Sequence, residues 1–116
     1  MIDGEIIRFG SGDIAVGSGF DMFGRLCFHQ IKPPQEVGVR VTSGEVEYIG
    51  NPIVFEGYEE ISELAQKAKR VKSGEMLTFE CFGYIFDFSE GDPRSIDVVI
   101  KHADRALNQL VQLLAC

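Results

Sequence analysis

A thiol and an imidazole stand two residues apart at Cys27 and His29. Residues i and i+2 of a strand share a face, so this pair could form half of a metal site or a nucleophile beside its base. Either site needs further groups. Cys81 belongs, by its neighbours, to the core on the opposite side of the sheet, and we expect His102 to be solvated on the flank of a helix. We therefore predict no metal ligands and no catalytic residues around this pair.

Asp87 has the most unusual surroundings of any carboxylate in the sequence, because it lies between Phe86 and Phe88. Burial among aromatic rings would raise its pKa and suit it to acid or base catalysis. The alternative, which we favour, is that Asp87 faces the exposed side or caps a neighbouring loop. No Ser-His-Asp order, HExxH or GxSxG motif accompanies it. The sequence therefore favours a non-enzyme, with a small enzyme as the alternative.

A match to the dinucleotide-binding pattern G-x-G-x-x-A runs from Gly10 to Ala15. That pattern has to open a helix, and the glycines at 17 and 19 would break a helix there. The phosphate-binding pattern GxxxxGK[ST] does not occur in the chain. We therefore predict no cofactor.

The charge balance limits the partners. The net charge is −7, and residues 1–66 hold 4 basic and 11 acidic residues. An acidic surface repels phosphate backbones, so we expect no nucleic-acid partner. No run approaches the roughly 18 apolar residues of a membrane span, and residues 1–10 lack the features of a secretory signal. We expect a cytoplasmic protein that binds no membrane, with its three cysteines as free thiols.

Two helices are predicted. Over residues 58–71, apolar side chains recur at helical spacing in a single stripe, with glutamates near the start and lysines near the end. Gly74 fits just beyond the end of this helix. The second helix starts with Asp92 as its N-cap and Pro93 at its first position, and runs to about residue 114.

The most apolar stretch, residues 76–89, holds four of the nine phenylalanines. Its alternation changes phase at Gly83, which predicts one long central strand with a β-bulge at that glycine. Further strands are predicted at 5–9, 14–20 and 25–31, and residues 53–55 could add another at an edge. The clearest hairpin signal joins 37–41 to 45–49 across a tight turn.

These elements predict the fold class. Strands that come first and are joined by short turns form a mainly antiparallel sheet. We predict a single α+β domain over residues 1–116, in two layers, with a sheet of five or six strands and two helices packed on one face. The other face would meet water. Its predicted residues are Arg40, Glu45, Glu47, Thr78 and Glu80.

The first functional hypothesis is a non-catalytic binding protein that meets a basic protein partner through an acidic surface and also forms a homodimer. Phe82 and Ile85 fall on the wet side of the predicted central strand, which is an unusual place for large apolar residues unless another surface covers them. The predicted interaction surface comprises Phe20, Met22, Phe23, Phe82, Ile85, Glu45, Glu47 and Glu80.

The second hypothesis is a small-molecule-binding protein or a small enzyme, with a pocket between the helices and the sheet. The strand at 14–20 has a nearly bare face that a ligand could approach, although close helix packing is the simpler reading. The predicted pocket is lined by Gly17, Gly19, Tyr84 and Asp87.

Overall fold

The computed structural model describes residues 3–8, 14–20, 25–32, 34–42, 44–89 and 91–114 of the chain. It contains two helices and seven strands. In chain order these are β1 (Asp3–Arg8), β2 (Ile14–Phe20), β3 (Arg25–Lys32), β4 (Arg40–Thr42), β5 (Glu47–Glu56), α1 (Gly57–Lys72), β6 (Thr78–Cys81), β7 (Tyr84–Asp87) and α2 (Arg94–Leu114).

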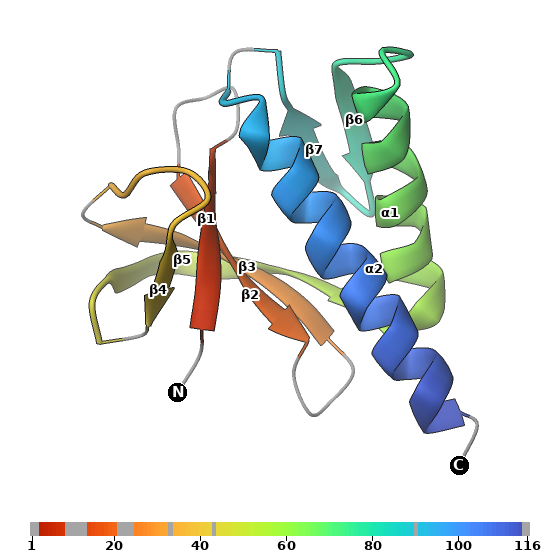
Figure 1. Ribbon diagram of the computed structural model, residues 1–116, viewed down its shortest axis with the longest axis horizontal. Helices are drawn as coiled ribbons and strands as arrows, with labels where there is room; N and C mark the ends of the chain where they lie inside the picture. Colours follow the sequence, from red (N-terminus) through yellow and green to blue (C-terminus); the bar gives the residue numbers. More distant parts are fainter. Residues whose placement is uncertain are drawn as a thin grey trace.

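The predicted fold class is confirmed. Five strands form an antiparallel sheet in the order β4-β1-β2-β3-β5, and β6 and β7 form a separate two-stranded sheet. The two helices pack side by side on one face of the larger sheet (Figure 1), with α2 over β1 and β2. Neither helix, over its described residues, is long and apolar enough to cross a membrane.

The predicted long central strand at 76–89 is wrong, because this stretch is a hairpin. Its strands pair in the register Phe79 with Phe86 and Cys81 with Tyr84. The two residues between them, Phe82 and Gly83, have φ angles of +50° and +87°. Positive φ at both central residues is the mark of a type I′ turn, whose twist matches that of the paired strands. The change of phase at Gly83 therefore reports a reversal of the chain and not a bulge.

The hairpin predicted across residues 37–49 is also wrong. Its first strand, β4, pairs with β1, and its second, β5, pairs with β3, so the two lie at opposite edges of the sheet. The connection between them covers part of the face turned away from the helices, where a second apolar cluster forms. The far face is therefore not simply wet, as the sequence had suggested. The members of this cluster are Ile6, Ile31, Val37, Val41 and Val46.

Helix α1 is confirmed to within one residue at each end. The residues of its predicted stripe, Ile61, Leu64, Ala65, Ala68 and Val71, are all buried. The chain leaves the helix through Gly74, whose φ of +89° is the left-handed conformation expected after a helix C-terminus.

Helix α2 begins where the sequence predicted. The Asp92 carboxylate accepts the backbone N–H of Arg94 at 2.9 Å, as an N-cap does. The hydrogen bonds and the charge of Arg94 lower the pKa of Asp92 to about 2. The start of the helix is therefore held by a carboxylate that remains ionised over the whole physiological range.

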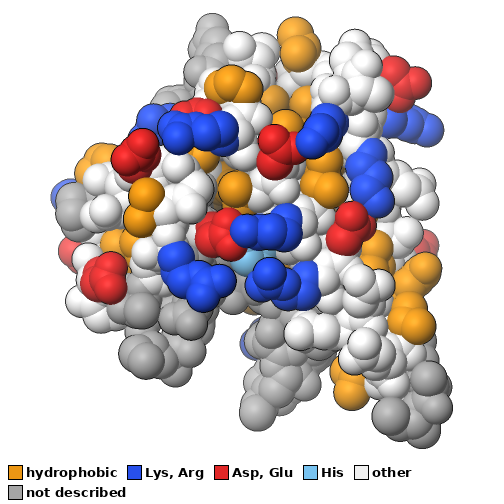
Figure 2. Space-filling model, in the orientation of Figure 1, with side chains coloured by type: hydrophobic (Ala, Val, Ile, Leu, Met, Phe, Trp, Pro, Cys, Tyr) orange, Lys and Arg blue, Asp and Glu red, His pale blue; other side chains and the backbone are white. Residues whose placement is uncertain are grey.

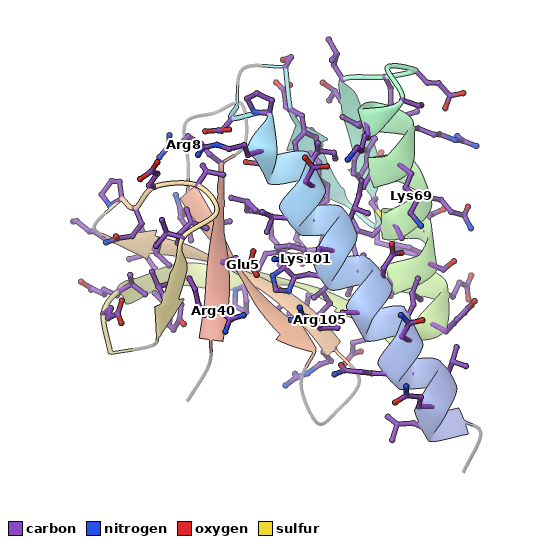
Figure 3. The ribbon with its side chains drawn as sticks, in the orientation of Figure 1. Glu5, Arg8, Arg40, Lys69, Lys101 and Arg105 are labelled. Atoms are coloured by element: carbon purple, nitrogen blue, oxygen red, sulfur yellow. The ribbon has the colours of Figure 1, made fainter. Side chains whose placement is uncertain are left out.

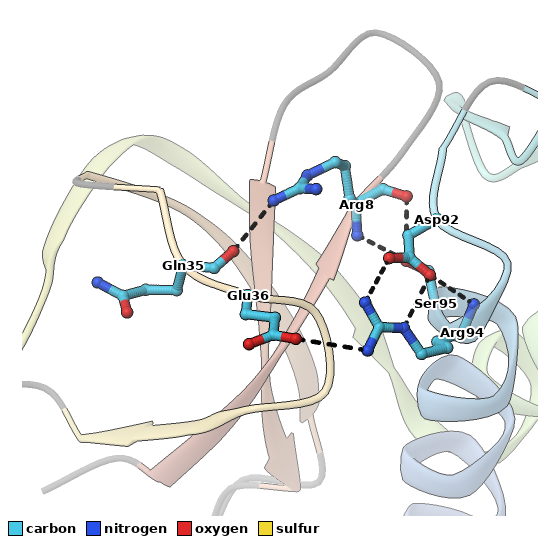
Figure 4. A network of polar contacts seen from close by, with 6 residues as sticks. All are labelled: Arg8, Gln35, Glu36, Asp92, Arg94 and Ser95. Carbon is cyan, nitrogen blue, oxygen red and sulfur yellow. Dashed lines mark hydrogen bonds and ion pairs between the residues drawn. The ribbon is translucent and has the colours of Figure 1, made fainter.

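The first turn of α2 is joined to the end of β1 (Figure 4). The fully buried Ser95 hydroxyl accepts the backbone N–H of Arg8 at 2.7 Å and donates to the Arg8 carbonyl at 3.0 Å. The Arg8 guanidinium donates to the Gln35 carbonyl, and Arg94 lies 3.7 Å from the Glu36 carboxylate. The segment that precedes β4 is thereby attached to both elements.

The main core lies between the larger sheet, both helices and the inner face of the hairpin. Phe86 of β7 lies within 6.4 Å of Phe28, within 5.9 Å of Phe55 and within 5.0 Å of Phe79, measured between ring centroids. Burial of such rings is worth about 2 kcal/mol each. The hairpin therefore covers the core with its aromatic inner face, and its outer face lies outside the core.

Candidate functional site

The tip of the hairpin exposes apolar side chains. Ile85 is 73% exposed, Phe82 46% and Tyr84 36%. We call these three residues the hairpin tip. Ile85 projects from the outer face opposite Glu80, whereas Tyr84 belongs to the inner face and its ring edge meets Phe55 at 5.9 Å. The exposure of Phe82 and Ile85, on which the sequence prediction depended, is present, although a turn and not a bulge produces it.

Phe82 has an unusual backbone. It is the only non-glycine residue with positive φ in the part of the chain that the structure describes. The left-handed region costs an L-residue with a large side chain about 1 kcal/mol, and asparagine or glycine usually occupies it. An exposed aromatic residue thus occupies a position where a small polar one would be more stable.

Three other predicted surface residues, Phe20, Met22 and Phe23, are not tested. Met22 and Phe23 lie outside the described residues, and Phe20 ends β2 with its side chain outside the description. Their role in an interface stays a prediction.

The predicted acidic residues are exposed but do not share one sheet. Glu47 is the first residue of β5 in the larger sheet and Glu45 lies just before it, whereas Glu80 belongs to the hairpin. The Lys67 ammonium donates to the Glu80 backbone carbonyl at 2.5 Å and lies 3.9 Å from the Glu63 carboxylate. The acidic surface is therefore divided between two parts of the molecule.

The four predicted pocket residues come from two elements. Gly17 and Gly19 belong to β2, a strand that packs against α2, and what covers the face of these two glycines stays a prediction. Asp87 is half-buried and accepts hydrogen bonds from the Ser89 hydroxyl and N–H and from the Thr78 hydroxyl. These bonds lower its pKa, the Ser89 bonds most strongly. Asp87 therefore caps a loop, as we favoured, and the pocket stays a prediction.

The Cys27 and His29 pair lies opposite the core face of β3, as predicted. The Cys81 thiol is buried on the helix side, where burial and the nearby Glu63 carboxylate raise its pKa to about 11. His29 is half-buried against the Tyr48 ring at 4.7 Å, and burial lowers its pKa. No three His, Cys, Asp or Glu side chains among the described residues gather into a metal site.

The prediction for His102 is wrong, because its side chain is only 4% exposed. Helix α2 packs against α1 on one side and against β1 and β2 on another. Its buried arc is consequently wider than a single stripe, and His102 lies within that arc. A second stripe at spacings of three and four, Ser95, Val99, His102 and Ala106, was the signal that could have shown this.

His102 belongs to a polar contact between β1 and α2 that the sequence did not reveal. Glu5, only 7% exposed, binds the Lys101 ammonium through both carboxylate oxygens, and its Oε1 lies 3.7 Å from His102 Nε2. With the Arg8–Ser95 bonds, these residues form what we call the β1–α2 seam: Glu5, Arg8, Ser95, Lys101 and His102. Figure 3 shows Lys101 reaching from α2 toward Glu5.

Electrostatics at the seam follow from burial and neighbouring charges. Burial raises the pKa of Glu5, but the hydrogen bond and charge of Lys101, with His102 and Arg40, outweigh it and the pKa is lowered. Burial lowers the pKa of His102, Glu5 opposes that shift, and the cations Lys101, Arg105 and Arg40 add to it. The seam therefore holds an ionised carboxylate beside a neutral imidazole at neutral pH.

No family model, curated protein or solved structure matches this chain. Its function is accordingly argued from the hairpin tip and the β1–α2 seam.

Proposed function

We propose that this protein is a non-catalytic interaction protein that self-associates through the hairpin tip. The observation that carries the proposal is the position of Phe82, which is exposed and held in a backbone conformation unfavourable to phenylalanine. Strained residues persist where the surrounding structure or a function requires them. A contact that covers this ring would supply that function.

The apolar area is concentrated enough to serve as an anchor. Phe82 and Ile85 lie within four positions of one another on a tight turn, and both are large and exposed. Interfaces gain most of their energy from a few such anchors, which are usually aromatic or large aliphatic side chains. Covering the two would remove apolar surface worth about 25 cal/mol per Å² from water.

A second copy of the chain is the occupant that the hairpin fits. Within the described residues, β7 pairs with β6 and with no other strand. Two such hairpins can pair edge to edge around a two-fold axis, because an isologous contact uses the same surface on both copies. Each copy would then place its Ile85 and Phe82 against those of the other.

Charge distinguishes a second copy of the chain from a basic protein partner. The exposed Glu45, Glu47 and Glu80 would suit the basic partner. Two copies that each carry a net charge of −7 repel one another. Added salt screens that repulsion and should strengthen self-association, whereas the attraction of a basic partner to the glutamates should weaken. The direction of the salt dependence therefore distinguishes the two partners.

The test is sedimentation velocity of the whole protein over a concentration series at low and high salt. We expect a concentration-dependent dimer that high salt favours, and its loss in Phe82→Asn and Ile85→Lys. Leu113→Lys is the matched control, because it places the same charge at an exposed apolar residue of α2 far along the chain from the hairpin. It should dimerise as the natural sequence does.

A monomer at every concentration would contradict the proposal, and so would a dimer that Ile85→Lys leaves intact. Charge reversal at Glu45, Glu47 and Glu80 tests the basic partner separately. Retained binding to such a partner would count against the acidic surface.

We further propose a cytoplasmic location and a function without nucleic acid or membrane. Cys27 and Cys81 are free thiols, which suits a reducing compartment. The net charge of −7 disfavours phosphate backbones.

A further inference from the structure

The imidazole of His102 lacks hydrogen-bond partners. Within the described structure neither ring nitrogen has one, although the side chain is 4% exposed. A neutral imidazole always presents one N–H donor and one acceptor. The nearest carboxylate oxygen, Glu5 Oε1, lies 3.7 Å from Nε2, which is too far for a hydrogen bond. Buried polar groups are nearly always paired, so an unpaired ring of this kind requires an explanation.

Three cations lie around this ring. Lys101 precedes it on α2, Arg105 follows one turn after Lys101, and Arg40 stands directly opposite Glu5 in the pairing of β1 with β4. Residues opposite one another in a sheet share a face, so Arg40 projects on the same side as Glu5. Figure 3 shows Arg40 and Arg105 on either side of the point where Lys101 meets Glu5.

These three cations differ in whether a carboxylate pairs with them. Lys101 is bound by both oxygens of Glu5. Neither Arg40 nor Arg105 lies within ion-pair distance of a carboxylate in the described part of the chain. On the same face, Figure 2 shows several Lys and Arg side chains gathered near one another, with Asp and Glu side chains between them. Glu5 is therefore paired with Lys101. Among the described residues, the guanidinium groups of Arg40 and Arg105 remain near the His102 ring without a carboxylate partner.

We propose that Arg40, Arg105 and His102 bind a phosphate group at the β1–α2 seam. The guanidinium groups would each donate to its oxygens, and the imidazole N–H would donate to a third. Guanidinium geometry suits the oxygens of a phosphate, to which it can donate two parallel hydrogen bonds. Lys101 and Glu5 position the site, because their mutual contact fixes the side of α2 that faces β1.

Charge favours a doubly charged ligand over a carboxylate. Arg40, Lys101 and Arg105 carry three positive charges against the single negative charge of Glu5, which leaves an excess of two when His102 is neutral. A phosphate dianion balances this excess, whereas a carboxylate leaves one charge. The phosphate could be free in solution or belong to a small ester, and both present the same oxygens.

The test is an NMR titration of the whole protein at pH 7.5 with inorganic phosphate, sodium chloride keeping the ionic strength constant. Ring signals of His102 and side-chain Nε signals of Arg40 and Arg105 should shift and saturate, while those of His29 stay in place. Glycerol phosphate, titrated in the same way, distinguishes the two sources. Tighter binding than inorganic phosphate indicates an ester, and weaker binding indicates the free ion.

Substitutions then assign the contacts. Arg40→Gln and Arg105→Gln should each weaken phosphate binding about ten-fold or more, as expected for the loss of a charge-assisted hydrogen bond. Arg70→Gln, which removes the same charge from an exposed position on α1, should change it by less than two-fold. His102→Gln, which keeps a donor, should bind more tightly than His102→Leu, and the thermal melt of each confirms its fold.

The proposal fails if the His102 shifts do not saturate, or if acetate binds as tightly as phosphate. It also fails if Arg70→Gln weakens binding as much as Arg105→Gln does, because general attraction to positive charge would then explain the result.

Discussion

The hairpin tip and the β1–α2 seam each reverse the usual distribution of side chains. At the seam, Glu5 and His102 are 7% and 4% exposed. At the tip, Ile85 and Phe82 are 73% and 46% exposed. Folded proteins normally bury apolar residues and leave charges in water. The two regions depart from that rule in opposite directions.

The departures differ in what compensates them. At the seam, Lys101 and the backbone of Arg8 satisfy most of the buried polar groups inside the molecule. The hairpin tip has two unfavourable features, its exposed apolar surface and the positive φ of Phe82. No contact among the described residues offsets them in a comparable way. Structure alone thus accounts for most of the seam, whereas the tip points to a partner.

The largest effect that this contrast predicts follows from Ser95→Ala. The substitution leaves the Arg8 N–H and carbonyl without their partner at the end of β1, at a cost of about 2 kcal/mol in the free energy of unfolding. Urea denaturation followed by circular dichroism measures it. Ser62→Ala on α1, where the hydroxyl accepts only a long bond of 3.4 Å from Gln66, should lie within about 0.5 kcal/mol of the natural sequence. Equal losses in both variants would remove the distinction.

A smaller effect of opposite sign is expected at the tip. Phe82→Asn places in the turn a residue suited to positive φ, and should raise the free energy of unfolding by about 1 kcal/mol. The same variant should no longer dimerise, so its loss of association could not be attributed to misfolding. Measurement at a concentration where the protein is monomeric isolates the stability term. A destabilised Phe82→Asn monomer would show that the ring packs within its own chain.

The smallest effect is a dependence on pH. Because the folded pKa of His102 lies below the ordinary value of 6.5, the unfolded chain binds more protons just below that pH. Stability is therefore complete above about pH 6.5 and falls as the pH drops through the unfolded pKa. His29 is shifted in the same direction, so both variants, His102→Gln and His29→Gln, are needed. Denaturation between pH 7.5 and 5 should show a shallower slope in each, and an unchanged slope in His102→Gln would contradict the shift.

Local patterns predicted the helices well. In α1 the apolar stripe and the charges at its ends all agree, and the buried residues of the helix are those of that one stripe, so the pattern could be interpreted directly. In α2 the N-cap Asp92 was equally clear. His102 was missed because a helix in contact with two neighbours buries more than one stripe, and the sequence does not reveal how many neighbours a helix has.

Strand pairing was harder to predict. The Phe82-Gly83 turn was overlooked because Asn-Gly or Asp-Gly is the usual signal for a type I′ turn, and phenylalanine is not. The predicted strands at 37–41 and 45–49 overlap β4 and the start of β5 only in part, and residues 53–55 continue β5 instead of forming a separate strand. The short turn between the two predicted strands suggested that they pair. The two strands instead lie at opposite edges of the sheet, on either side of the far-face cluster around Ile6 and Ile31. Such contacts between distant parts of the chain leave no local trace.

The bonds between β1 and α2 have a consequence for synthesis. Arg8 and Ser95 are 87 positions apart, and Glu5 and Lys101 are 96 apart. A ribosome adds about 5–20 residues per second, so β1 emerges several seconds before the helix that completes it. Strands β1 to β3 can pair during this interval, but the Glu5 carboxylate has no Lys101 to bind until α2 covers the sheet. The native state can therefore form only after α2 has been synthesised, and contacts of such long range make the final step slow.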